Sequence, residues 1–143
     1  MPERVRDHAW SLSSDPSRLR EARRGLVRIL HEAGFDPGET RDLAVAFSEA
    51  CGNLHRHAFK GRTDGRVDLR VAIEEDRATV WLDHEGERFD PARYRPPDLV
   101  RPSESGYGVY LIARLVDEVS YEEVGAHERI VLVKLRRPAG VRA

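Results

Sequence analysis

Apolar residues recur at helical spacing in two neighbouring segments of the first half of the chain. The first segment follows Asp15-Pro16 and ends at Gly34, and the second follows Asp36-Pro37. An aspartate before a proline is typical of a helix N-cap and first turn, and a glycine often follows the last helical residue. The pattern predicts two amphipathic helices, whose buried stripes are Leu19, Ala22, Leu26, Val27, Leu30 and Ala33 in the first and Leu43, Phe47, Ala50, Leu54 and Ala58 in the second.

From Arg66 onward the apolar residues change to every second position. Val67, Leu69, Val71 and Ile73 alternate with polar residues, as expected for a strand with one buried face. The chain then turns and resumes a strand pattern, which predicts a hairpin with its turn over Glu74–Arg77 and its second strand over Ala78–Leu82.

Shorter patterns complete the order of elements. They predict an edge strand over Val5–Leu12, a helix over Gly108–Val116, and two closing strands over Val119–Glu122 and Ile130–Leu135 around a turn at Gly125. With strands grouped on one side and helices on the other, the fold class predicted is α+β, a two-layer α/β sandwich.

A proline-rich stretch interrupts this order. Four of the eight prolines fall between Arg88 and Gly106. Proline removes a backbone donor and fixes φ, so a long surface loop is expected there. Loops of this length are usually functional.

Composition narrows the functional classes. The 143 residues suit a single domain, and 24 basic against 25 acidic residues leave a formal charge of −1. No global field therefore attracts nucleic acid or anionic lipid, and we expect no direct nucleic-acid partner and no membrane partner. A single cysteine and the lack of a signal-peptide pattern lead us to expect the cytoplasm.

The candidate chemistry begins on the second predicted helix. Glu49 and Asn53 are four residues apart and project from one helix face, so a carboxylate and a carboxamide can converge on one ion or water. About fifty residues later, Gly106 and Gly108 open the third predicted helix, where a backbone can approach phosphate oxygens closely. Together they predict a magnesium-nucleotide site. Taken alone, Glu49 with Asn53 is more simply a solvated helix edge.

Neighbouring histidines and the cysteine invite other interpretations. His55 and His57 are two residues apart, so on a helix they point to different faces and do not complete a zinc pattern. For His57 we expect capping or packing near the helix end. Cys51 has no histidine partner fixed by the sequence, which favours a small buried residue over a nucleophile.

Three ordered motifs resemble the anti-sigma-factor serine kinases of the RsbW and SpoIIAB type, within the GHKL ATPase superfamily. EACGNLHRHA (49–58) resembles the N-box of that family, HEGERFDP (84–91) its first glycine box, and ESGYGVYLIARLVDEV (104–119) its second glycine box with the following helix. The resemblance covers nearly the whole chain. It implies one histidine kinase-like ATPase domain over residues 1–143 with a Bergerat-type sandwich and a proline-rich ATP lid at about 87–105.

The resemblance also implies residue roles, cofactors and partners. Glu49 corresponds to the general base and Asn53 to the magnesium ligand, with ATP and Mg²⁺ as cofactors. The nucleotide-binding positions that it implies are Asn53, His57, His84, Gly86, Arg101, Gly106 and Gly108. Its members bind a sigma factor and phosphorylate one serine of a STAS-domain anti-anti-sigma protein. A homodimer is implied by the resemblance alone.

Some residues depart from the family pattern. His84 stands where the family has an aspartate that accepts a hydrogen bond from the adenine amino group. His84 is either a direct ligand of the nucleotide or a polar residue at a strand end whose hydrogen bonds are satisfied within the protein. Asp83 can replace that aspartate only if a bulge shifts the strand by one residue. Arg88 replaces a glycine, and we expect it to add positive charge near phosphate, whereas Arg101 is expected to compensate for Glu104.

These departures leave a second function open: a non-catalytic partner-binding module with weakened or altered nucleotide binding. A detached histidine-kinase catalytic domain is a third reading, but nothing in the sequence supplies the helix pair with a phospho-accepting histidine.

Overall fold

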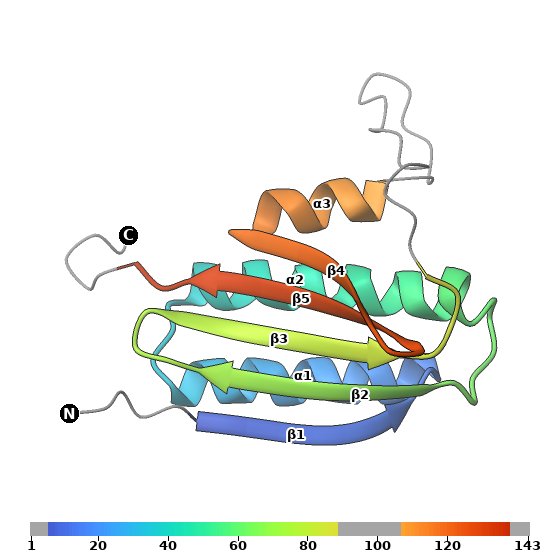
Figure 1. Ribbon diagram of the computed structural model, residues 1–143. Helices are drawn as coiled ribbons and strands as arrows, with labels where there is room; N and C mark the ends of the chain where they lie inside the picture. The colour runs from blue at the N-terminus through green and yellow to red at the C-terminus, as the bar shows by residue number, and fades with distance from the viewer. Residues whose placement is uncertain (1–5, 89–106, 138–143) are drawn as a thin grey trace.

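The protein forms a two-layer α/β sandwich in a computed structural model that describes residues 6–88 and 107–137. A five-stranded antiparallel sheet has the order β1-β2-β3-β5-β4, and α1 and α2 cover one of its faces (Figure 1). The elements are β1 (Arg6–Ser13), α1 (Pro16–Glu32), α2 (Pro37–Asn53), the π-helical turn η1 (Leu54–Ala58), β2 (Arg66–Ile73), β3 (Arg77–His84), α3 (Tyr107–Leu115), β4 (Glu118–Val124) and β5 (His127–Leu135). The α+β class, the two layers and the edge position of β1 are confirmed.

Local chemistry starts the two long helices at the predicted residues. Asp15 accepts a hydrogen bond from the Ser17 N–H at 2.8 Å, and Asp36 accepts one from the Glu39 N–H at 2.7 Å. The Asp36 N–H in turn donates a hydrogen bond to Glu39 Oε1 at 3.2 Å, which completes a capping box. After α1 the chain leaves helical geometry at Gly34, whose φ of 85° suits glycine.

The core lies between the helices and the inner face of the sheet. The fully buried side chains include Leu26 and Leu30 of α1, Phe47 of α2 and Leu82 of β3. Ile112 of α3 is also buried, so the third helix belongs to this core and packs beside α2. This packing brings the segment after residue 106 against the second helix.

Two details differ from the sequence-based expectation. The second helix does not continue as an α-helix to Ala58, because η1 widens its last turn, with the Phe59 N–H bonded to the Leu54 carbonyl at 2.9 Å. Strands β3, β4 and β5 are longer than predicted, since charged residues at their ends pair across strands. Of the predicted lid at 87–105, residues 89–105 lie outside the described residues.

Within the described ranges, no helix is both long and apolar enough to cross a membrane.

Candidate functional site

The candidate site lies where α2 and α3 meet. Glu49 and Asn53, on the last turns of α2, are partly exposed, whereas Ala50 and Cys51 beside them are buried. Gly108, in the first turn of α3, lies directly against both polar side chains. A Cβ at Gly108 would be 3.0 Å from Glu49 Oε2 and 3.3 Å from Asn53 Oδ1. The structure thus brings together three of the predicted site residues, although Gly108 lies more than fifty residues after Glu49 and Asn53 in the chain.

Glycine is needed at position 108 because of this close approach. Its φ is not positive, so backbone freedom does not explain it. A side chain there would press on the carboxylate and the carboxamide of α2. The missing Cβ lets the backbone of α3 lie directly against the Glu49 and Asn53 side chains.

Arg56 is a site neighbour that the sequence analysis missed. It lies in η1, and its guanidinium Nη2 donates a hydrogen bond to Asn53 Oδ1 at 3.4 Å. Its guanidinium also lies over Gly52, close to the position that a Cβ would take. The available signal was its place seven residues after Glu49, which returns a side chain to the same helix face.

The end of β3 passes beside the end of η1. The Glu87 N–H donates to the Ala58 carbonyl at 2.9 Å, and a Cβ at Gly86 would lie 2.7 Å from the same oxygen. Gly86 is therefore required for close backbone packing between the predicted first glycine box and the predicted N-box. The two motifs are neighbours in space, as expected for parts of one site.

His84 is fully buried at this point. Its Nε2 and Glu128 Oε1 on β5 are 2.8 Å apart, and its Nδ1 accepts the Gly86 N–H at 3.1 Å. Because Nδ1 accepts a hydrogen bond, the ring proton lies on Nε2 and is donated to Glu128. The edge of the ring also meets Phe59. This geometry favours the satisfied polar residue, and a direct contact with a nucleotide base would require one of these bonds to break.

The alternative based on Asp83 is wrong. The ladders of β3 with β2 and with β5 run in regular register through His84, without a bulge. Asp83 consequently points to the opposite face of the sheet, where it pairs with Arg129 at 2.8 and 3.0 Å. A carboxylate on that face cannot reach the site between the helices.

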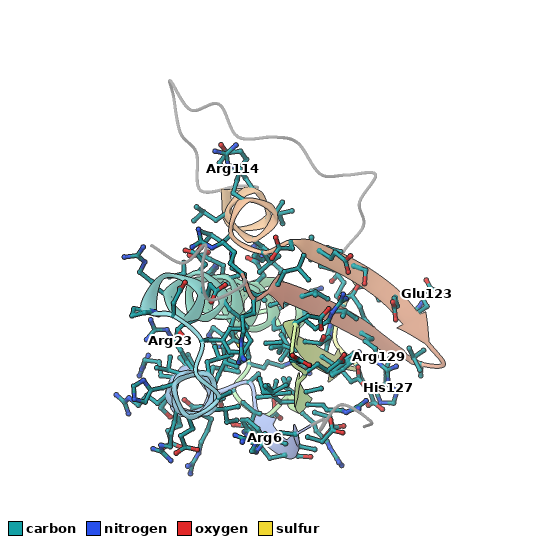
Figure 2. The ribbon with its side chains drawn as sticks, turned by 90° about the vertical axis from the view of Figure 1, so that its left-hand side faces the viewer. Arg6, Arg23, Arg114, Glu123, His127 and Arg129 are labelled. Carbon is teal, nitrogen blue, oxygen red and sulfur yellow. The ribbon has the colours of Figure 1, made fainter. Side chains whose placement is uncertain are left out.

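Arg88 binds the β4–β5 hairpin. Its guanidinium contacts Glu123 Oε1 at 2.8 Å and the Gly125 carbonyl at 3.2 Å. A second contact with this hairpin joins His127 Nε2 to Glu85 Oε1, and these two atoms are 2.9 Å apart. Figure 2 shows Glu123 and His127 near the end of this hairpin. These contacts hold the Arg88 guanidinium at the hairpin, and they do not favour the expectation that Arg88 adds charge near phosphate.

The remaining candidates divide into three groups. His57 is exposed, and among the described residues its ring has no hydrogen bond, so a capping or packing role for it stays a prediction. Burial raises the pKa of the Cys51 thiol, which keeps it protonated and confirms a buried residue. Arg101 and Gly106 lie outside the described residues, so their roles stay predictions.

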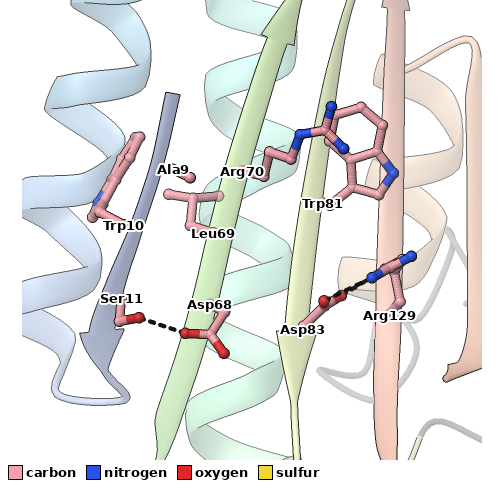
Figure 3. Close-up of a pocket in the computed structure, with 9 residues that line it drawn as sticks. All are labelled: Ala9, Trp10, Ser11, Asp68, Leu69, Arg70, Trp81, Asp83 and Arg129. Carbon is pink, nitrogen blue, oxygen red and sulfur yellow. Dashed lines mark hydrogen bonds and ion pairs between the residues drawn. The ribbon is translucent and has the colours of Figure 1, made fainter. Parts of the chain in front are cut away.

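A hollow of about 330 Å³ lies on the open face of the sheet, away from the helices (Figure 3). Its charged groups already have partners: Asp83 pairs with Arg129, Asp68 accepts a hydrogen bond from the Ser11 hydroxyl, and Arg70 pairs with Asp7. The Arg70 guanidinium lies 4.3 Å from the centre of the Trp81 ring. This hollow does not include Glu49, Asn53 or Gly108, so it is separate from the candidate site.

Comparison with known proteins identifies the family. The family model described as the histidine kinase-like ATPase domain matches residues 12–134. The chain belongs to the histidine kinase-like ATPase family. It is similar to the serine-protein kinase RsbW of Bacillus subtilis (strain 168), with 36% identity over 108 residues that cover 66% of this chain and 68% of the relative. RsbW of Listeria monocytogenes is 34% identical over 122 residues, which cover 78% of each protein.

These relatives place this histidine kinase-like ATPase in the RsbW branch of serine-protein kinases, and the resemblance drawn from the three motifs is confirmed. A solved structure of the RsbU and RsbW domains of a Mycobacterium tuberculosis protein is also similar, with a TM-score of 0.68 over 94% of this chain. The chain spans 33% of that longer protein at 19% identity, so this likeness supports the fold alone.

The residues at the α2–α3 contact fit a magnesium nucleotide. No side chain at Gly108 separates the backbone of α3 from Glu49 and Asn53, which suits a close approach of phosphate oxygens to that backbone. The Asn53 amide oxygen is a suitable ligand for a hard cation. Among the described residues, no group of three histidine, cysteine or acidic side chains forms a separate metal site.

Proposed function

We propose that this histidine kinase-like ATPase is a serine-protein kinase that acts as an anti-sigma factor in the cytoplasm. It binds a sigma factor, and with ATP and Mg²⁺ it phosphorylates one serine of an antagonist protein with a STAS fold. The observation that carries the proposal is the approach of Gly108 to Glu49 and Asn53. The RsbW-type relatives support the kinase activity.

Glu49 is the general base of the proposed reaction. Its carboxylate is half-buried at the boundary between core and solvent, and it is held on a regular helical turn of α2. From there it would accept the proton of the serine hydroxyl as the hydroxyl oxygen forms its bond to the γ-phosphorus of ATP, while the bond between that phosphorus and the bridging oxygen breaks and ADP leaves. A positioned base of this kind typically contributes about 10²–10⁴-fold to the rate.

Asn53 and Gly108 hold the other components. When bound, magnesium ATP supplies the phosphoryl group that is transferred. The Asn53 Oδ1 would hold the cation, and the first amides of α3 around Gly108 would face anionic oxygens at the positive end of the helix. His57, His84, Gly86, Arg101 and Gly106 remain proposed members of the nucleotide site.

The test separates chemistry from binding. In Glu49→Ala, phosphate transfer to the antagonist should fall by at least about 100-fold, while the unfolding temperature and ATP affinity stay close to those of the parent. Asn53→Ala should weaken ATP binding only when Mg²⁺ is present. The matched control is Glu32→Ala, an exposed carboxylate at the end of α1. Full transfer activity in Glu49→Ala would remove the assignment of the base.

One observation favours a second function. Both ring nitrogens of His84 already have partners, so the position that the family uses to recognise adenine offers no free acceptor. This suits a partner-binding module with weakened nucleotide affinity. Calorimetric titration distinguishes the two functions: micromolar binding of magnesium ATP supports the kinase, and the absence of heat at millimolar nucleotide supports the binding module.

A further inference from the structure

Lys134 is a largely buried cation that joins three elements of the fold. It is two residues after the buried Leu132 on β5, and so shares the face of the sheet that the helices cover. Its side chain is only 14% exposed. The ammonium donates to Asp42 Oδ2 of α2 at 3.2 Å and to the Leu115 carbonyl at the end of α3 at 2.9 Å. A buried ammonium is costly unless it is paired, so these two contacts hold it in place.

α3 runs antiparallel to α2 and makes close contacts near both of its ends (Figure 1). Near its N-terminal end, Gly108 lies against Glu49. At its C-terminal end, Lys134 joins Leu115 to Asp42. Leu115 follows Gly108 by seven residues in α3. Glu49 likewise follows Asp42 by seven residues in α2, so both intervals measure about 10 Å along a helix axis. The contact at Lys134 therefore fixes the register in which Gly108 comes opposite Glu49.

The end of α3 is also fastened to β5 on both sides of Lys134. The Asp117 N–H donates to the Val133 carbonyl at 2.9 Å, and the Leu135 N–H donates to Asp117 Oδ2 at 2.7 Å. These bonds hold the chain that leaves α3 against the sheet, whereas Lys134 reaches on to α2. Its positive charge lies at the C-terminal end of α3, where the helix dipole is negative. The last turn of α3 is therefore a fixed point, and the place of the first turn depends on it.

We propose that Lys134 is a positioning residue for phosphate transfer. This proposal rests on the proposed function. By holding Leu115 against Asp42, Lys134 keeps the first turn of α3 in register with Glu49 and Asn53. A slip of α3 along α2 by one residue would move that turn by about 1.5 Å. Because a misplacement of about 1 Å can lower a rate by about 100-fold, Lys134 acts on the reaction from the far end of α3.

The experiment replaces Lys134 by methionine, which keeps an unbranched apolar stem but has no charge and no donor. In Lys134→Met, kcat for phosphate transfer from ATP to a STAS-domain antagonist should fall by about tenfold to 100-fold, while KM for the antagonist changes by less than about twofold. In the protein without nucleotide, the Gly108 amide resonance should shift in an NMR spectrum, because its distance from Glu49 and Asn53 changes. Lys134→Arg should recover part of kcat, since a guanidinium can donate to both acceptors.

Asp42→Asn is a milder variant of the same contact. It removes the charge partner of Lys134 and leaves the bond to the Leu115 carbonyl in place. It should lower kcat by a smaller factor than Lys134→Met, and the double variant should lose little more than Lys134→Met alone. Independent, multiplying losses of kcat would contradict the shared contact and overturn the inference.

Arg136→Met is the matched control. Arg136 directly follows β5, and its Nη2 donates to the Ala33 carbonyl at 2.7 Å, so it contacts the end of α1 as Lys134 contacts the end of α3. Its replacement should lower the free energy of unfolding but leave kcat and the Gly108 resonance unchanged. Equal losses of kcat in the two variants would indicate a structural role and overturn the inference, as would an unchanged kcat in Lys134→Met. A parent protein that transfers no phosphate would refute the proposed function itself, whereas an active parent with a fully active Lys134→Met refutes the positioning role alone.

Discussion

Replacing Gly108 by alanine adds one methyl group at the contact between α3 and α2. The new Cβ would lie 3.0 Å from Glu49 Oε2 and 3.3 and 3.4 Å from the two terminal atoms of the Asn53 amide. These separations are shorter than ordinary van der Waals contacts of about 3.5–4.0 Å. The carboxylate and the amide must therefore move by a few tenths of an ångström.

The effect of this substitution on stability should be small. Alanine is more favourable than glycine inside a helix by about 1 kcal/mol, and this gain offsets the strain of the close contact. The polar ends of Glu49 and Asn53 are partly exposed and can shift, whereas a buried backbone could not. We expect the free energy of unfolding to change by less than about 1 kcal/mol in either direction.

The effect on activity should be much larger. A displacement of about 1 Å in a catalytic group can lower a rate by about 100-fold, so a shift of a few tenths should lower it by about tenfold. Phosphate transfer from ATP to a STAS-domain partner measures this rate, and urea denaturation measures stability. Gly25→Ala on α1 is the control, because its Cβ would make only an ordinary contact with Trp10 at 3.8 Å.

The result that refutes this reasoning is specific. If Gly108→Ala transfers phosphate at the parental rate, the contact with Glu49 and Asn53 has no catalytic consequence. If instead Gly25→Ala and Gly108→Ala lose activity equally, the loss reflects a general effect of glycine replacement in helices.

Two further predictions concern stability. Replacing His84 by alanine should lower the free energy of unfolding by about 3 kcal/mol, because it leaves a cavity and removes a hydrogen bond from buried Glu128; additive effects in a double-mutant cycle with Glu128→Ala would contradict this coupling. The hydrogen bond from the Ser17 N–H holds the pKa of Asp15 below its ordinary value of 3.8, so the stabilisation that Asp15 gives is present above that pH and is lost as pH falls through the lowered pKa. In urea titrations across this range, Asp15→Ala should be less stable than the parent at neutral pH, and the difference should shrink in acid; a constant difference would show that the charge is not involved.

Short-range chemistry explains why the helices were predictable. Asp15 and Asp36 are followed by proline, and each caps a backbone N–H within its own first turn. The apolar stripes need only a helical period to be recognised, and the hairpin between β2 and β3 needs only alternation and a turn. The effect of Gly34 is also local, because its positive φ ends the helix at that residue.

Long-range contacts explain what the sequence did not provide. His84 could be suspected as a departure from a motif, but its partner Glu128 depends on the register between β3 and β5. A shift of one residue would have turned Asp83 inward instead, and only the observed pairing excludes it. The widened turn η1, which carries the hydrogen bond from Arg56 to Asn53, has no signal in hydrophobic spacing, because its buried residues Leu54 and Ala58 are four apart, as in an α-helix.

The sequence by itself determined the elements, the two layers and the membership of Glu49, Asn53 and Gly108 in one family pattern. Only the tertiary structure decided that these groups meet, and that Gly108 is required for space rather than for backbone conformation. The physical reason is range: caps, turns and periodicity depend on neighbours within a few residues. A contact between α2 and α3 depends instead on how the whole core packs.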